Sequence, residues 1–190
     1  MHGARFKIAR RAHRGVTLIE LLVALAIVAI LGAIAAPTFR DLALNSARTA
    51  TVNDFFHALF LARSEAIKRG QIVSLCPSAD GQSCAKQQGA WTQGWIVFVN
   101  KDRDEPVVRD EDEPLLAVYR PRENISIESN RASYSFRPHV QAVVNGTIVF
   151  CDPRGSAHAR AIIISHTGRP RVAQRDSSGK PLKCGANGAA

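Results

Sequence analysis

Near its amino terminus this chain of 190 residues carries an uninterrupted apolar stretch, which has to be buried in lipid or in protein. Between Val16 and Pro37 the only ionisable side chain is Glu20, and the positions from Leu21 to Ala36 hold only Leu, Val, Ala, Ile and one Gly. A helix needs about 20 apolar residues to cross the ~30 Å hydrocarbon core of a bilayer, and this stretch just provides them. The sequence therefore predicts one membrane-spanning helix over residues 16–37.

The residues before this stretch are basic and indicate how it is oriented. Positions 1–14 contain five Lys or Arg residues and no acidic residue: Arg5, Lys7, Arg10, Arg11 and Arg14. Because basic flanks stay in the cytoplasm, we expect a single pass through a membrane with residues 1–14 on the cytoplasmic side and the rest of the chain beyond the span on the other side. A cleaved secretory signal would have its small-residue site after the apolar run, whereas here Gly15 precedes the run. This order does not fit a cleaved secretory signal.

The segment Arg14-Gly15-Val16-Thr17-Leu18-Ile19-Glu20-Leu21-Leu22 resembles the processing site of type IV prepilins and type II secretion pseudopilins. The resemblance implies that residues 1–15 are a basic leader, which a prepilin peptidase removes between Gly15 and Val16 before methylating the new amine. The apolar segment then remains in the mature protein. Most members begin with Phe after cleavage, so Val16 departs from the usual pattern. Pro37 stands where such pilins commonly have a proline that bends the helix.

Glu20 is unusual because it is a carboxylate at membrane depth. Such a group is costly unless it has a partner or a neutralising proton. The resemblance implies that Glu20 pairs with the amino terminus of a subunit and guides docking into a growing fibre. The alternative is a carboxylate at the level of the lipid headgroups without a partner.

The helical pattern continues beyond Pro37. Apolar residues recur at spacings of three and four along one face: Val52, Phe55, Leu59, Ala62 and Ala66. Gly70, after two basic residues, is a typical helix stop. We therefore expect an amphipathic second half over 38–70 and one helix from about Val16 to Arg69, roughly 80 Å long at 1.5 Å per residue.

After Gly70 the sequence changes to short β-rich runs separated by turn residues. The expected strands are 72–76, 95–99, 115–119, 125–127, 133–136, 147–151 and 161–165. The predicted fold class is α+β and pilin-like, with one long helix packed on antiparallel strands. Residues 71–190 form the periplasmic head in this interpretation, with a basic tail over 151–190.

The four cysteines are Cys76, Cys84, Cys151 and Cys184. In the periplasm disulfides persist, and four cysteines allow three connectivities. Cys76 and Cys84 enclose a short loop and Cys151 and Cys184 enclose the tail, which favours these local pairs without excluding the other two arrangements. A zinc site is the alternative, but the chain has no C-x-x-C and no paired His at the usual spacing.

Positive charge is concentrated in the tail. Residues 16–150 hold 13 basic and 14 acidic side chains, whereas residues 151–190 hold seven basic and two acidic ones. The seven are Arg154, Arg160, Arg169, Arg171, Arg175, Lys180 and Lys183. Guanidinium groups bind phosphate oxygens in a bidentate way, so the tail is a candidate nucleic-acid surface. The alternative is an ordinary solvated surface.

Several motifs together resemble the GspH/FimT family of minor pilins. They are Trp91, the runs 94–98, 147–151 and 162–169, and the pair Arg154-Gly155. Gly168-Arg169-Pro170-Arg171 matches the GRxR motif of the FimT branch, which implies binding of double-stranded DNA for natural transformation. The resemblance also implies other major and minor pilins as partners, and a final location in a type IV pilus on the cell surface.

The physical chemistry of the motif is consistent with that role. Gly168 permits a positive φ, Pro170 fixes the backbone, and Arg169 and Arg171 project to the same side of an extended segment. No aromatic residue follows Phe150, which argues against base stacking and favours sequence-independent duplex binding. Two alternatives stay open. In one, the arginines pair with the acidic loop over residues 100–111. In the other, the protein is a structural minor pilin or pseudopilin of a pilus tip or secretion priming complex.

Neither a metal site nor catalysis is expected. Four residues occupy calcium-loop positions, Asn100, Asp102, Asp104 and Glu111, but Glu105 replaces the turn glycine and Val108 replaces a ligand. The chain has no G-x-S-x-G, H-E-x-x-H, phosphate-loop or dinucleotide motif. We therefore predict no cofactor, no metal and no enzyme activity.

Overall fold

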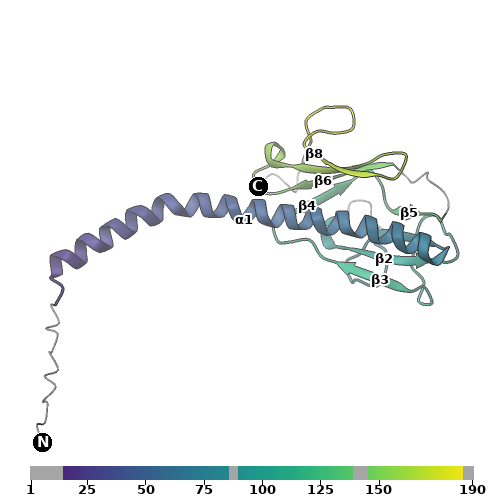
Figure 1. The fold of residues 1–190 in the computed structure, drawn as a ribbon, viewed down its shortest axis with the longest axis horizontal. Helices are drawn as coiled ribbons and strands as arrows, with labels where there is room; N and C mark the ends of the chain where they lie inside the picture. Colours follow the sequence, from purple (N-terminus) through teal and green to yellow (C-terminus); the bar gives the residue numbers. More distant parts are fainter. Residues whose placement is uncertain (1–14, 86–89, 139–144, 186–190) are drawn as a thin grey trace, which may run out of the picture. The chain divides into compact units, whose positions relative to one another are not determined.

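The computed structural model describes residues 15–85, 90–138 and 145–185. They form parts of two compact units, residues 1–42 and residues 43–190. Helix α1, Leu18–Arg69, has 52 residues and runs through Pro37 without a break (Figure 1). Its apolar part is long enough to cross a membrane, with a mean hydropathy of 2.8 over 18 residues that are not buried in protein.

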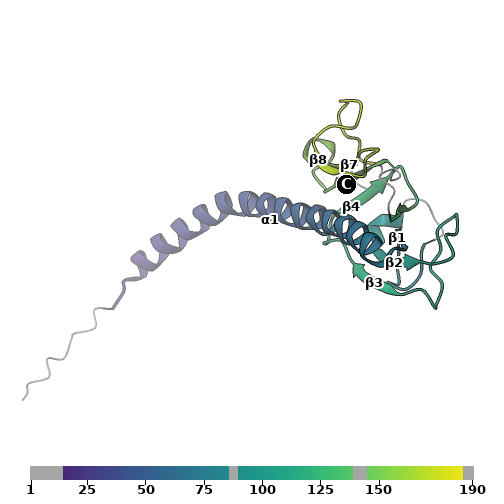
Figure 2. The ribbon, with the colours of Figure 1, turned by 45° about the vertical axis from the view of Figure 1, so that its right-hand side comes forward.

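The second unit contains two antiparallel four-stranded sheets. The first has the strand order β3-β2-β1-β5 and the second has the order β4-β6-β7-β8. The strands are β1 (Ile72–Pro77), β2 (Trp95–Asn100), β3 (Leu115–Tyr119), β4 (Ser126–Ser129), β5 (Tyr134–Phe136), β6 (Gly146–Cys151), β7 (Arg160–Ile164) and β8 (Pro170–Ala173). Figures 1 and 2 both show β2 and β3 on one side of the second half of α1 and β4 and β8 on the other side.

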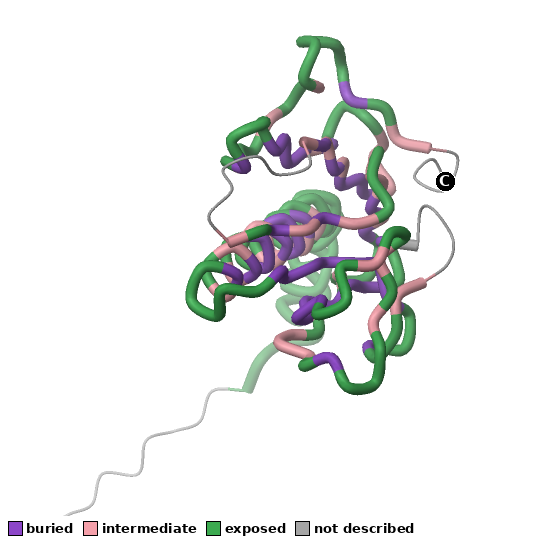
Figure 3. The backbone as a smooth tube through the Cα atoms, turned by 90° about the vertical axis from the view of Figure 1, so that its right-hand side faces the viewer, coloured by how far each residue is buried: buried purple, intermediate pink, exposed green. Residues whose placement is uncertain are grey.

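The core lies where α1 meets both sheets, and Figure 3 shows the buried residues in purple there. The helix contributes the predicted apolar face, which includes the fully buried Phe55. The ring of Phe55 lies 5.0 Å from that of Trp95, 5.4 Å from that of Trp91 and 5.8 Å from that of Phe150. Because Trp95 belongs to the first sheet and Phe150 to the second, this one helical residue packs against both sheets.

The predicted fold class is confirmed, and one strand was not predicted. Strand β8 follows directly from Gly168 and Arg169, where the sequence reads as a turn and a basic tail rather than as an apolar run. Proline is tolerated at its first position because β8 is the edge strand of the described sheet, where its neighbour is β7. The other strands agree with the expected ranges to within one or two residues.

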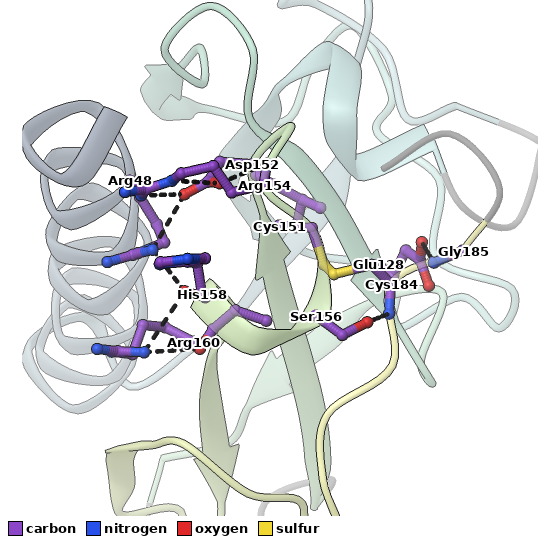
Figure 4. Close-up of a disulfide and its surroundings, with 12 residues drawn as sticks. Arg48, Glu128, Cys151, Asp152, Arg154, Ser156, His158, Arg160, Cys184 and Gly185 are labelled. Carbon is purple, nitrogen blue, oxygen red and sulfur yellow. Dashed lines mark hydrogen bonds and ion pairs between the residues drawn. A yellow bond between two sulfur atoms is a disulfide. The ribbon is translucent and has the colours of Figure 1, made fainter. Parts of the chain in front are cut away.

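Two disulfides close the head, and they are the local pairs that the spacing favoured. Cys76 pairs with Cys84, and Cys151 pairs with Cys184 with their Cα atoms 6.0 Å apart. The second disulfide holds the tail on the face of β6 and β7 that points away from the main core, where Leu182 is buried against Ala161. Figure 4 shows this disulfide beside Ser156, whose hydroxyl accepts a hydrogen bond from the Cys184 amide.

Candidate nucleic-acid interface

The β7–β8 turn positions the predicted DNA-binding motif. Gly168 has a φ of +70°, the conformation expected of it, and its amide donates to the carbonyl of Ser165 at 2.8 Å. The amide of Ser165 donates to the carbonyl of Arg169 at 3.2 Å, and the amide of Arg169 donates to the Ser165 hydroxyl at 3.3 Å. These bonds fix the backbone immediately before the two arginines.

Helix α1 supports the same turn from the other side. The Arg63 guanidinium donates to the carbonyl of Gly168 at 3.2 Å and to that of Thr167 at 3.4 Å. Arg63 belongs to the second half of the helix, within the same compact unit as the turn. The turn is therefore attached to the helix as well as to the sheet.

The register of the second sheet determines where Arg171 points. Arg171 lies opposite Ile163 on β7, and residues directly opposite in an antiparallel pair share a face. The neighbours Ile162 and Ile164 belong to the main core, so Ile163 and Arg171 are on the other face. Arg169 lies before β8, so the alternation of the strand does not place it on the face of Arg171. It lines a groove together with residues of α1, which packs on the core side of the sheet, so the two arginines do not share one side as the sequence predicted.

Arg169 and Arg171 are both exposed. Within the described part of the chain, neither guanidinium has a hydrogen bond or an ion pair. The alternative in which they pair with the acidic loop is therefore not what the structure shows. Both guanidinium groups are therefore accessible to an anionic ligand.

Three further candidate residues follow β8 and are exposed: Arg175, Lys180 and Lys183. Arg175 forms an isolated backbone bridge with Pro181, and its guanidinium donates to the carbonyl of Gly179 at 3.1 Å. Asp176 closes the intervening turn, because its carboxylate accepts from the amides of Ser178 and Lys180. The hydrogen bond from the Ser178 hydroxyl, followed by that from the Lys180 amide, holds the pKa of Asp176 below its usual value.

Arg154 and Arg160 are not part of this exposed group. The Arg154 guanidinium binds Asp152, with Nε–Oδ1 at 3.0 Å and Nη2–Oδ2 at 2.7 Å, and the side chain is only 15% exposed. Arg160 donates to the carbonyl of Ala159 at 2.9 Å. Figure 4 shows Arg154 beside Arg48 of α1 and Arg160 next to His158. Arg154 is therefore not a DNA contact of the kind predicted, because its guanidinium is largely buried and held by Asp152.

Arg48 and Asp152 form a buried ion pair that the sequence did not reveal. Arg48 Nη1 lies 3.0 Å from Asp152 Oδ2, and both side chains are almost fully buried. Burial alone would raise the pKa of Asp152, but the hydrogen bonds from Arg154 keep it below its usual value. Burial also lowers the pKa of Arg48, whose guanidinium donates to the carbonyl of His158 as well. Together these contacts attach the β6–β7 loop to the helix.

The calcium-loop candidates bind one another in the structure. The Asn100 amide nitrogen donates to Asp104 Oδ1 at 2.9 Å, and Asp104 Oδ2 accepts from the amide of Val108 at 2.7 Å. Over residues 15–85, 90–138 and 145–185, no cluster of three or more His, Cys, Asp or Glu side chains is arranged to hold a metal ion. The side chains of Asn100 and Asp104 therefore stabilise the conformation of the loop that follows β2.

The predicted processing residues Gly15 and Val16 precede the start of α1. Thr17 caps the helix, because its hydroxyl accepts a hydrogen bond from the amide of Glu20 at 3.3 Å. Glu20 is exposed in the first turn, where a carboxylate also interacts favourably with the helix dipole. This gives Glu20 a local role in addition to the one expected of it in assembly.

Two family models match the chain. The model described as Type II transport protein GspH matches residues 51–168, and the prokaryotic N-terminal methylation motif matches residues 10–36. The GspH match ends at Gly168, so both exposed arginines of the motif lie outside it. No curated protein sequence matches the chain.

Among solved structures, the chain is similar to two crystal forms of the type IV minor pilin FimU from Pseudomonas aeruginosa strain PAO1. For the P21 form the TM-score is 0.50 at 19% identity, covering 78% of this chain and 99% of FimU. For the P65 form the TM-score is 0.48 at 17% identity, covering 72% and 98%. At this identity the likeness of the P21 form shows a shared fold.

The methylation motif begins before the apolar helix, and the GspH match covers more than half of the chain, from the amphipathic part of α1 to the β7–β8 turn. These are the two parts of a type IV pilin or pseudopilin, whose members are structural subunits. The chain therefore belongs to the GspH family of type II transport proteins and is a minor pilin or pseudopilin.

Proposed function

We propose that this minor pilin belongs to the FimT branch and binds extracellular double-stranded DNA without sequence preference for uptake in natural transformation. The observation that carries the proposal is the pair Arg169 and Arg171, which are exposed on a fixed hairpin without a countercharge among the described residues. Guanidinium groups in this state can bind phosphate oxygens without first breaking an internal ion pair.

The remaining exposed cations extend this surface along the tail. Arg175, Lys180 and Lys183 follow the hairpin and can contact further phosphates. Arg160 is a peripheral contact in this proposal, because it is only partly exposed, unlike Arg175, and its guanidinium donates to two backbone carbonyls. Base edges are not read, so we expect a dissociation constant on the order of 10⁻⁶ to 10⁻⁴ M at physiological salt.

The proposal includes the path by which the subunit reaches the fibre. Prepilin peptidase cuts between Gly15 and Val16, residues 16–37 hold the subunit in the inner membrane, and residues 71–190 lie in the periplasm as the head. Residues 38–70 connect the two as the amphipathic half of α1. Glu20 pairs with an amino terminus when the subunit joins major and minor pilins, and retraction of the fibre then pulls bound DNA toward the cell.

A second function is supported by the extent of the GspH match. Because the match stops at Gly168, a subunit of a pilus tip or a type II secretion priming complex would need the helix and the sheets but not the exposed arginines. This function requires no DNA. The double substitution Arg169→Gln, Arg171→Gln separates the two functions, because only DNA binding depends on those side chains.

The test is a salt series with fluorescent duplex DNA and the full chain in a nonionic detergent. For the wild type we expect the logarithm of the association constant to fall with the logarithm of the salt concentration. A slope of about −2 to −4 is expected for a few phosphate contacts. The double substitution should remove most of the binding. The matched control is Arg120→Gln, Arg122→Gln, which removes the same charge from an exposed loop after β3. Equal loss in both variants, or no binding by the wild type at low salt, would exclude the proposal.

A further inference from the structure

A groove lies between helix α1 and the start of β8. It is lined by six residues, Phe60, Arg63, Ser64, Ile67, Arg169 and Pro170, and its volume is about 500 Å³. The first four come from the helix and the last two from the DNA-binding motif. All six belong to the compact unit of residues 43–190. An aromatic ring thus borders the proposed phosphate contact, although 109 positions separate Phe60 from Arg169 in the sequence.

The helical wall of the groove is an exposed apolar surface. Phe60, Ser64 and Ile67 are spaced by four and three residues, so they lie on one side of α1. Phe60 is 49% exposed and Ile67 is 60% exposed, whereas the core side of the helix is buried. The ring of Phe60 packs at 5.0 Å against that of Phe56, which supports it. The groove therefore offers a supported aromatic ring to an outside ligand.

The charge of the groove is positive. Arg63 and Arg169 are both in its lining, and none of the six lining residues is acidic. The nearest acidic residue along this part of the helix, Glu65, has ion pairs with Lys68 and Arg69. An apolar side chain of another subunit placed here would remove water from the Arg169 guanidinium without providing a partner, which is costly. The groove fits an occupant that combines a flat ring with an anion.

We infer that the groove binds one unpaired nucleobase of the DNA strand whose phosphate is contacted by Arg169, with the base stacked on Phe60. The inference rests on the proposed function and specifies its ligand. Bases inside a duplex, including the terminal pairs of a blunt end, are already stacked and paired, so only an overhang or a single-stranded segment can supply this base. The protein then binds a duplex with an overhang more tightly than a blunt duplex. The tail itself has no aromatic residue, and the fold supplies one from the helix.

The first experiment compares two ligands, a blunt duplex and the same duplex with a short single-stranded overhang, titrated with the full chain in nonionic detergent. We expect the wild type to bind the overhang about five- to tenfold more tightly, since stacking of a base on an aromatic ring gives a gain of this order. Phe60→Leu keeps an apolar side chain but removes the ring. It should bring the ratio of the two affinities, overhang to blunt, to about one, while the affinity for the blunt duplex stays unchanged. Phe60→Ala should give the same result.

The outcomes separate this inference from the proposed function. If Arg169→Gln, Arg171→Gln abolishes binding of both ligands but Phe60→Leu leaves the overhang ratio unchanged, DNA binding stands and the base site is excluded. If the wild type binds neither ligand, both fail. If Phe60→Leu instead changes the sedimentation of the chain without DNA, the groove is a contact between subunits and the inference is overturned.

The second experiment detects the stacked base directly. Trp91 and Trp95 are fully buried, so Phe60→Trp adds an exposed fluorophore whose emission can be separated from theirs. We expect the overhang duplex to quench this emission and the blunt duplex to leave it unchanged. An overhang of abasic sugar-phosphate is the matched control and should not quench. Equal quenching by the abasic overhang would show a backbone contact only and would contradict the inference.

Discussion

The guanidinium of Arg63 lies 3.2 Å from the carbonyl oxygen of Gly168 and donates a hydrogen bond to it. A residue of the amphipathic helix thus fixes the turn that carries the proposed DNA-binding motif. This bond joins positions 105 residues apart and is partly buried, so its geometry depends on the packing of the helix against the second sheet.

Replacing Arg63 with Gln should loosen this turn. We expect a loss of about 1 kcal/mol in the free energy of unfolding, since a charged hydrogen-bond donor is removed from two carbonyls. DNA affinity should fall a few-fold, because Arg169 is no longer held in place. The measurements are chemical denaturation and the salt-series titration. Arg63→Lys keeps the charge and is the control, and a loss of affinity equal to that of Gln would point to positioning rather than to charge.

Gly168→Ala tests the need for a positive φ in the turn. A Cβ in the left-handed conformation costs about 1–2 kcal/mol, so the variant should be destabilised by that amount. Gly168→Asn should recover a large part of the loss, because Asn tolerates this conformation. Thermal unfolding of the three proteins gives the comparison. Equal stability of the Ala variant and the wild type would show that the turn adopts another conformation.

Asp152→Asn should be strongly destabilising. The substitution leaves Arg48 buried with a neutral partner, and breaking a buried ion pair costs about 3 kcal/mol or more. The exposed pair of Lys101 and Asp112 supplies the control, since Asp112→Asn should cost less than about 1 kcal/mol. Urea denaturation at neutral pH measures both.

The same substitution should flatten the dependence of stability on pH. The pKa of Asp152 is lower in the folded protein than in the unfolded chain. Its contribution is therefore complete above the unfolded pKa of about 4 and is lost as pH falls through the lower folded value. Between pH 5 and pH 2 the free energy of unfolding should fall less steeply in Asp152→Asn than in the wild type. Parallel curves would show that Asp152 is not the group responsible.

Removing the Cys151–Cys184 disulfide should cost roughly 3–4 kcal/mol on the chain-entropy model, because it closes a loop of 33 residues. The Cys76–Cys84 disulfide has a separation of only eight residues and should contribute less. Paired Cys→Ser variants of each disulfide, unfolded in urea, provide the comparison. The reverse order would contradict the entropic account.

Local patterns predicted the helix, seven strands and the turn at Gly168, because each depends on residues close together in the sequence. The spacing of the cysteines favoured the observed disulfide pairs but left the other two connectivities open. They did not predict the pair of Arg48 and Asp152, which is 104 residues apart, or the approach of Phe60 to Arg169. Those contacts arise when the helix packs on the second sheet. Strand β8 was missed for a related reason, since Pro170 and Arg171 form a strand only beside the apolar β7.

The disulfide between Cys151 and Cys184 has a mechanical consequence. Arg169 and Arg171 lie inside the covalent loop that it closes, and β8 is an edge strand that can peel from β7 under load. If β8 detaches from β7, only the residues between Cys151 and Cys184 can extend, because the disulfide then transmits the force to Cys151. Cys151 ends β6, an inner strand of the sheet. A force applied to Arg169 and Arg171 is thus borne by β6, inside the sheet, before residues outside the disulfide loop can extend.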